Sequence, residues 1–175
     1  MVKFEEIFSA FLAHKNRLKM LNVATCDLAG KPNAVSKMIV DVIAPNHVYY
    51  LDYPFTHTYA NLQVNPQISI SFMDDTSFTG YRLTGRARIL KSGADFKNAK
   101  KQWAKRLIRY EADRMIQRIT GHASTREAEN ELPENFFIVK VTATEGAVIK
   151  ADRALRAVHG LAPQSDTPAA ARKTA

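Results

Sequence analysis

The sequence predicts a mainly β fold, in which six antiparallel strands form a barrel, with one helix before the strands and a long helix before the last strand. Three observations favour this class. Short segments rich in Val, Ile and Tyr alternate hydrophobic and polar residues and follow one another at hairpin spacing. Two other segments have the 3.6-residue hydrophobic period of helices. The glycine-rich phosphate loops of parallel α/β nucleotide-binding folds do not occur.

The regular elements of the first half can be assigned in order along the chain. Apolar residues at helical spacing predict a helix over residues 3–20. Alternating segments then predict five strands, over 23–26, 33–43, 47–52, 68–72 and 80–91. Between the third and fourth strands, Thr56 is a candidate N-cap for a short helix that reaches Leu62 and ends before Asn65 and Pro66.

The second half is expected to hold one more long helix and one more strand. Ser92, with Asp95 three residues later, suits a capping box for a helix that runs to about Ile119. Beyond it we expect a polar loop, a sixth strand and a short helix, at 122–134, 136–150 and before Gly160. We expect one domain over residues 1–160 and a disordered tail over 161–175, because the tail lacks core-forming residues.

Composition narrows the class of protein. The 175 residues are 46% hydrophobic and 24% charged, with a net charge of +8 that suits an anionic ligand. A single cysteine, Cys26, excludes an internal disulfide and a thiolate metal cluster, and the five histidines are dispersed, so no metal site is expected. No apolar run approaches the roughly 20 residues of a membrane helix, and the acidic N-terminal segment does not suit a signal peptide. We therefore expect a cytoplasmic protein with no membrane partner.

The segment from Phe55 to Leu62 is the most informative for function. It places the hydroxyls of Thr56 and Thr58 and the imidazole of His57 at the first turn of the expected short helix. The unpaired amides and the positive end of the helix dipole favour an anion there. Two interpretations stay open: these groups hold a phosphate, or Thr56 only caps the helix and His57 lies in solvent.

The second expected strand is mostly apolar but contains a lysine, Lys37. Lys37 shares one strand face with Ile39, whereas Ser36 and Met38 share the other. An unpaired buried ammonium is costly, so Lys37 needs either solvent or an anion. Cys26, on the preceding strand, is expected to be a small buried residue rather than a nucleophile.

Basic side chains gather in two further places. Arg82, Arg86 and Arg88 share one face of the fifth strand, which is either an anion-binding row or the solvated side of the sheet. The long helix carries a run of cations: Lys97, Lys100, Lys101, Lys105, Arg106 and Arg109. This run is interpreted as a solvated helix face, with a nucleic-acid patch as the alternative. No interleaved aromatic residues support single-strand stacking, so nucleic acid ranks lowest.

Three stretches, in this order, resemble the pyridoxamine 5′-phosphate oxidase-like, FMN-binding split-barrel superfamily. They are NVATCDLAGKPNAVSKMIV (residues 22–40), VYYLDYPFTHTYANLQVNPQISISF (48–72) and GYRLTGRARIL (80–90). Each stretch alone is only weakly specific for this superfamily. The three stretches in this order are more specific than any one of them. The resemblance implies a six-stranded split β-barrel and a homodimer that binds FMN at the subunit interface.

The resemblance also implies which residues contact FMN. It assigns Ser36, Lys37, Met38 and Ile39 to the cofactor from the second strand, and Leu51 and Asp52 to the neighbourhood of the isoalloxazine ring. His57 and Thr58, next to the candidate cap Thr56, fall where the family holds the phosphate. The family commonly has a lysine or arginine at the position of His57, and Lys37 is the candidate that could supply that positive charge.

The activity that the resemblance implies is an FMN-dependent oxidoreductase acting on a small-molecule substrate or electron donor. Gly80 stands where true pyridoxamine phosphate oxidases carry a flavin-contacting glutamine, and Trp103 does not match their C-terminal tryptophan. A flavin reductase or an oxidase-related enzyme therefore fits better than vitamin B6 oxidation. No catalytic residue is assigned. The alternative is a non-catalytic flavin or heme binding or sensing protein, with His57 or His159 as candidate heme ligand.

Overall fold

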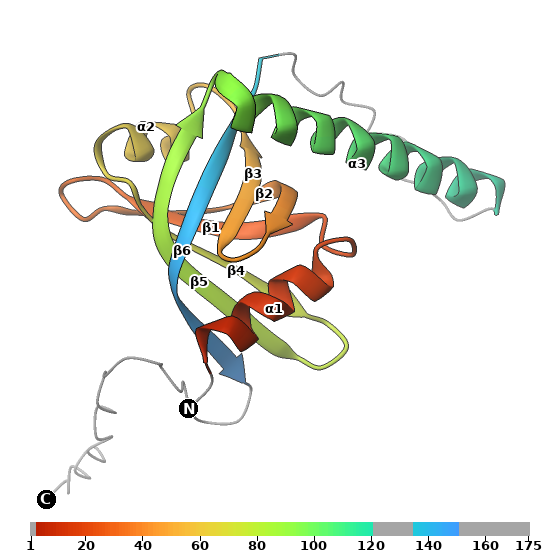
Figure 1. Cartoon of the computed structure of the whole chain (residues 1–175), viewed down its shortest axis with the longest axis horizontal. Coiled ribbons are helices and arrows are strands. Elements are labelled where there is room, and N and C mark those ends of the chain that lie inside the picture. The colour runs from red at the N-terminus through yellow and green to blue at the C-terminus, as the bar shows by residue number, and fades with distance from the viewer. Residues whose placement is uncertain (1–2, 121–134, 151–175) are drawn as a thin grey trace, which may run out of the picture.

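Six antiparallel strands close into a barrel in the order β1-β2-β3-β6-β5-β4 (Figure 1). The computed structural model describes residues 3–120 and 135–150. In chain order the elements are α1 (Phe4–His14), β1 (Met20–Cys26), β2 (Pro32–Ile43), β3 (His47–Asp52), α2 (His57–Val64), β4 (Gln67–Asp74), β5 (Thr79–Leu90), α3 (Gly93–Ile119) and β6 (Phe137–Lys150). The predicted mainly β class, the N-terminal helix and the long helix before the last strand are confirmed. The expected loop at 122–134, the helix before Gly160 and the tail lie outside the described residues.

The largest boundary difference is at the first helix, which ends at His14 rather than near residue 20. The amides of Arg17 and Leu18 both turn back to the carbonyl of His14, at 2.9 and 3.0 Å. Strand β1 then begins at Met20. Its residues pair with both β2 and β4, so ladder hydrogen bonds outweigh the local helical period of residues 15–20.

The inside of the barrel is the main hydrophobic core. Inward residues of the strands alternate with outward ones, as the period of two requires. The fully buried members include Leu21, Val23, Ile39, Tyr50, Ile70, Leu83 and Val139. Helix α1 adds Ile7, Phe8 and Phe11 to this core. A Cβ on Gly146 of β6 would lie 3.0 Å from the Ile7 side chain, so the glycine permits this close approach.

Two irregularities shape the barrel wall. The β2–β3 register shifts between Ile39 and Asp41, so after Ile39 the next residue in the barrel core is Val42 rather than Asp41, and Val40 is buried on the outside. The β5–β6 register shifts at Gly85, where a Cβ would lie 2.1 Å from the carbonyl oxygen of Thr142. Only a glycine fits at that contact.

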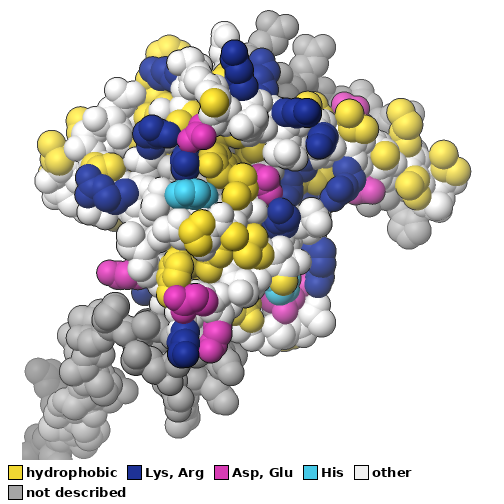
Figure 2. All heavy atoms as spheres, viewed as in Figure 1, with side chains coloured by type: hydrophobic (Ala, Val, Ile, Leu, Met, Phe, Trp, Pro, Cys, Tyr) yellow, Lys and Arg dark blue, Asp and Glu magenta, His cyan; other side chains and the backbone are white. Residues whose placement is uncertain are grey.

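Helix α3 packs outside the barrel through a second, smaller core. Its buried residues Ala99, Trp103 and Tyr110 cover an apolar patch of the wall made of Val40, Tyr49, Leu51, Leu90 and Ile138. The distal part of the helix extends past the barrel (Figure 1). Figure 2 shows hydrophobic side chains at that distal end, where Ile108, Met115, Ile116 and Ile119 are exposed. None of the helices in the described residues is long and apolar enough to cross a bilayer.

Two polar residues of α3 differ from their expected roles. Arg106, expected on a basic helix face, is only 9% exposed and donates hydrogen bonds to the backbone carbonyls of Lys15 and Leu18. Asp95, expected in a capping box, accepts instead from Lys140 at 3.0 Å and from Arg88 at 3.1 Å. The hydrogen bond from Lys140 lowers the pKa of Asp95. Both residues therefore connect the helix to the rest of the fold.

Trp103→Ala should lower the free energy of unfolding by about 3–5 kcal/mol, because it empties the centre of the contact between α3 and the barrel. Ile108→Ala, on the same helix but 67% exposed, is the control and should change it by less than about 0.5 kcal/mol. Urea unfolding followed by circular dichroism measures both values. Similar losses for the two variants would contradict the packing described for α3.

Candidate functional site

A buried ion pair between Lys37 and Asp52 lies where strand β2 changes partner. Residues up to Met38 pair with β1, whereas Ile39 and the residues after it pair with β3. Lys37 and Asp52 stand two positions beyond the last β2–β3 pair, Ile39 and Tyr50. The Lys37 ammonium donates to Oδ1 of Asp52, and the two residues are 7% and 0% exposed. The charge pair therefore joins the two strands where their backbone ladder has ended.

This pair shows that Lys37, which the sequence predicts to need either solvent or an anion, has an anion as its partner. A buried ammonium needs an anion, and here the anion is a carboxylate of the same chain. Oδ1 of Asp52 also accepts from the amide of Tyr53 at 2.8 Å and from the Thr56 hydroxyl at 3.1 Å. The positive charge of Lys37 is thus neutralised within the fold, and the pair as a whole is neutral.

Two polar atoms next to the pair have no hydrogen-bond partner among the described residues. They are Oδ2 of Asp52 and the hydroxyl of Tyr50, and both are buried. Burial raises the pKa of Tyr50 well above its ordinary value, and the nearby charge of Asp52 adds to this shift. Tyr50 therefore stays a neutral phenol at physiological pH.

Helix α2 begins at His57, five residues after Asp52, and Thr56 is its N-cap. The Thr56 hydroxyl caps it by accepting from the amide of Tyr59 at 3.0 Å, as the sequence predicted. His57 is exposed at the first position of the helix. The amides of His57 and Thr58 have no acceptor among residues 3–120 and 135–150. The turn therefore presents two free N–H donors and one imidazole.

The Thr58 side chain points away from this surface. It is 1% exposed, and its hydroxyl accepts from the Asn33 side chain at 3.1 Å. Asn33 and Asn61 both donate to the Thr25 hydroxyl, at 3.4 and 3.1 Å. This buried network fixes α2 against β1 and β2. At position 58 the backbone amide, rather than the hydroxyl, is free to meet a ligand.

The structure brings together some of the predicted site residues and separates others. Lys37, Asp52 and Thr56 are joined by hydrogen bonds, with His57 and Thr58 following on the helix. Four others lie elsewhere: Ser36 is exposed on the outer wall, Met38 packs toward α3, Ile39 is in the barrel core and Leu51 is buried under α3. The side chains of Ile39 and Leu51 are covered by the protein, so any cofactor contact they make in this conformation runs through the backbone.

Phe55 is a residue of this region that the sequence did not single out. Its side chain is fully exposed, at 101% of the reference area, and its φ of 69° is uncommon for a residue with a bulky side chain. An aromatic residue after a proline, just before a helix cap, was the available signal. Phe55 adds an exposed ring next to the free N–H donors of α2.

The part of the chain that the structure describes contains no group of three His, Cys, Asp or Glu side chains arranged for a metal ion. Among the described histidines, His47 lies beside Lys140, and His14 is 3.7 Å from Asp74. Burial, followed by the charge of Lys140, lowers the pKa of His47.

Lys37→Met should lower the free energy of unfolding by about 3–5 kcal/mol, because it leaves the Asp52 carboxylate buried without its cation. Adding Asp52→Asn should restore part of that loss, since asparagine is neutral and its oxygen can still accept from Tyr53 and Thr56. Chemical denaturation of both variants measures the difference. A double variant no more stable than the single one would show that the charge is not what makes the first change costly.

Comparison with known proteins identifies the family. The model of the family described as pyridoxamine 5′-phosphate oxidase matches residues 6–150. HupZ from Group A Streptococcus is 20% identical, with a TM-score of 0.55, and the match covers 86% of this chain and 96% of HupZ. No curated protein matches the sequence.

Two further solved structures share the fold. A Clostridium acetobutylicum protein of the pyridoxinephosphate oxidase family, related to general stress protein 26, is 19% identical with a TM-score of 0.53, over 81% of this chain and 89% of that protein. A Nostoc punctiforme protein described as pyridoxamine 5′-phosphate oxidase-related and FMN binding is 12% identical with a TM-score of 0.52, over 86% of each chain. At these identities the structures show a shared fold alone, whereas the family match spans most of the chain. The chain belongs to the pyridoxamine 5′-phosphate oxidase family.

Proposed function

We propose that this protein is an FMN-binding flavoprotein that holds the FMN phosphate at the first turn of α2. The observation that carries the proposal is the set of donors there: the free amides of His57 and Thr58, and the exposed His57 imidazole. Backbone amides at a helix N-terminus, together with the helix dipole, suit a phosphate. The FMN-binding description of the Nostoc punctiforme protein agrees with this ligand.

The Lys37–Asp52 pair makes this position compatible with an anion. Asp52 lies beside the helix cap, and an unpaired carboxylate there would repel a phosphate. Lys37 neutralises it. In our proposal Lys37 therefore acts on the phosphate through Asp52 rather than as a direct ligand, and His57 with the two amides makes the contacts.

We further propose that the protein is a homodimer and that FMN lies at the interface. The outer wall formed by β1, β2 and β4 carries small uncharged side chains. Paired residues place them in two rows across the strands, Ser36-Asn22-Ser71 and Ala34-Ala24-Ser69. In a chain with 24% charged residues, such a wall suits close packing against a second copy. Ser36 would then lie at the interface, with Phe55 available to cover the flavin ring.

Bound FMN would supply electron or hydride transfer, and the protein would hold the phosphate, orient the ring and exclude water. We therefore propose an FMN-dependent oxidoreductase, such as a flavin reductase or an oxidase-related enzyme, that uses a small-molecule substrate or electron donor. A reducing compartment such as the cytoplasm suits this role, because Cys26 is a free thiol.

Titration of FMN into the purified protein, followed by flavin fluorescence, should show saturable binding. His57→Ala should weaken this binding about tenfold or more, because one charge-assisted hydrogen bond to phosphate is worth that much. Gln63→Ala, at an exposed position of the same helix, is the control and should leave the dissociation constant unchanged. Absence of FMN binding by the unaltered protein would refute the proposal, and an unchanged constant for His57→Ala would remove His57 from the site.

A titration with hemin, on the same variants, tests the heme alternative. The exposed His57 imidazole favours that alternative, because imidazole is a good iron ligand. Addition of hemin should produce no Soret band that depends on His57 if the site is a flavin site. A Soret band that His57→Ala abolishes, with no FMN binding, would replace the flavin proposal by the heme one.

Charged residues introduced on the uncharged outer wall of β1, β2 and β4 test the proposed dimer. Ala24 and Ala34 face each other across β1 and β2, so Ala24→Arg together with Ala34→Arg places two cations at one point. The mass measured by light scattering should fall from that of two chains to that of one. Ala104→Arg, at an exposed position of α3, is the control and should leave the dimer intact. A single-chain mass for the unaltered protein at micromolar concentration would contradict the dimer.

A further inference from the structure

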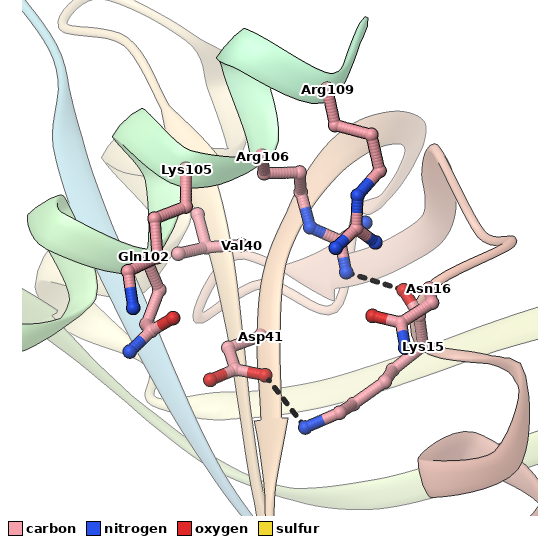
Figure 3. Close-up of a pocket in the computed structure, with 8 residues that line it drawn as sticks. All are labelled: Lys15, Asn16, Val40, Asp41, Gln102, Lys105, Arg106 and Arg109. Atoms are coloured by element: carbon pink, nitrogen blue, oxygen red, sulfur yellow. Dashed lines mark hydrogen bonds and ion pairs between the residues drawn. The ribbon is translucent and has the colours of Figure 1, made fainter.

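A cavity of about 270 Å³ lies between the end of α1, strand β2 and helix α3 (Figure 3). It is on the α3 side of the barrel, away from α2 (Figure 1). Four cationic side chains line it, Lys15, Lys105, Arg106 and Arg109, against a single carboxylate, that of Asp41. Asp41 pairs with Lys15 at 3.3 Å. Three positive charges of the lining therefore have no acidic partner within the cavity.

Arg106 is held rigidly at the base of this cavity. It is 91% buried, and it donates to the carbonyls of Leu18 and Lys15 and to the Tyr110 hydroxyl. These bonds close the end of α1 and fix the plane of the guanidinium. A guanidinium carries five N–H donors, so two of them remain without a partner in the described residues. A buried cation with free donors is a prepared contact for an anion.

Lys105 and Arg109 extend from the same face of α3 as Arg106 (Figure 3). Both are exposed, and neither forms an ion pair or side-chain hydrogen bond within residues 3–120 and 135–150. Like charges in adjacent turns of a helix repel one another. An anion between them would remove that repulsion and engage the free donors of Arg106.

We propose that this cavity binds a phosphate group, as free phosphate or as a small phosphomonoester. The donors of two arginines match the bidentate geometry of phosphate oxygens. The volume is below the roughly 300–1,000 Å³ of pockets for drug-sized ligands. No aromatic side chain is among the residues that line it, so the cavity offers no stacking surface for a nucleobase or a flavin ring. The bound phosphate would connect α1, β2 and α3.

The test is a calorimetric titration with inorganic phosphate and, separately, with glycerol 3-phosphate, at an ionic strength fixed by chloride. Lys105→Glu with Arg109→Glu should weaken phosphate binding about tenfold or more, since the loss of one charge-assisted hydrogen bond suffices for that change. Lys100→Glu with Lys101→Glu is the matched control: it makes the same charge change at exposed positions of the same helix, outside the cavity. The control should bind as the unaltered protein does.

Absence of phosphate binding by the unaltered protein, or equal weakening in both double variants, would overturn the proposal, because the second result would mean a general effect of net charge. Tighter binding of glycerol 3-phosphate would identify an ester site, and tighter binding of inorganic phosphate a free-anion site. Phosphate should still bind after the protein has been loaded with one FMN per chain. Loss of phosphate binding at that stoichiometry would make the cavity part of the flavin site and overturn its assignment as a separate one.

Discussion

The buried pair of Lys37 and Asp52 is the contact on which the candidate site depends. It spans the place where β2 leaves β1 and joins β3, so it connects β2 and β3 beyond the end of the backbone ladder between them. The same carboxylate oxygen accepts from Thr56, which in turn caps α2. The position of the helix start is therefore set by a charge inside the barrel. Because removal of either partner would leave an uncompensated buried charge, the two residues must be considered together.

The sequence predicted the architecture well because the barrel follows local rules. Alternation of inward and outward residues located the strands, and the Thr56 cap located α2. The predicted end of α1 was wrong. The helical spacing of the apolar residues continues to Leu18, but β1 begins at Met20 because it obtains its hydrogen bonds from two neighbouring strands. That choice depends on residues 32–38 and 69–71, which are distant in sequence. The local sequence pattern therefore cannot locate the boundary between α1 and β1.

The site was less predictable than the fold, because partners across the barrel decide what each polar residue does. Lys37 was recognised as needing an anion, but its pairing with Asp52 depends on the register of β2 against β3. The run of cations on α3 was interpreted as one solvated helix face. Arg106 instead turns inward and donates hydrogen bonds to the backbone at the end of α1. Whether the remaining predicted residues contact FMN stays a prediction. The covered side chains of Ile39 and Leu51 limit how they would do so.

The two proposed phosphate positions hold an anion by different physical means. At α2 the donors are backbone amides and one imidazole, and the charges of Lys37 and Asp52 beside them form a neutral pair. Fixed dipoles of this kind act over a single turn of helix. At the cavity beside α3, several whole charges converge on a guanidinium that is already held in place. Binding there depends more strongly on ionic strength, since the exposed Lys105 and Arg109 are screened by salt.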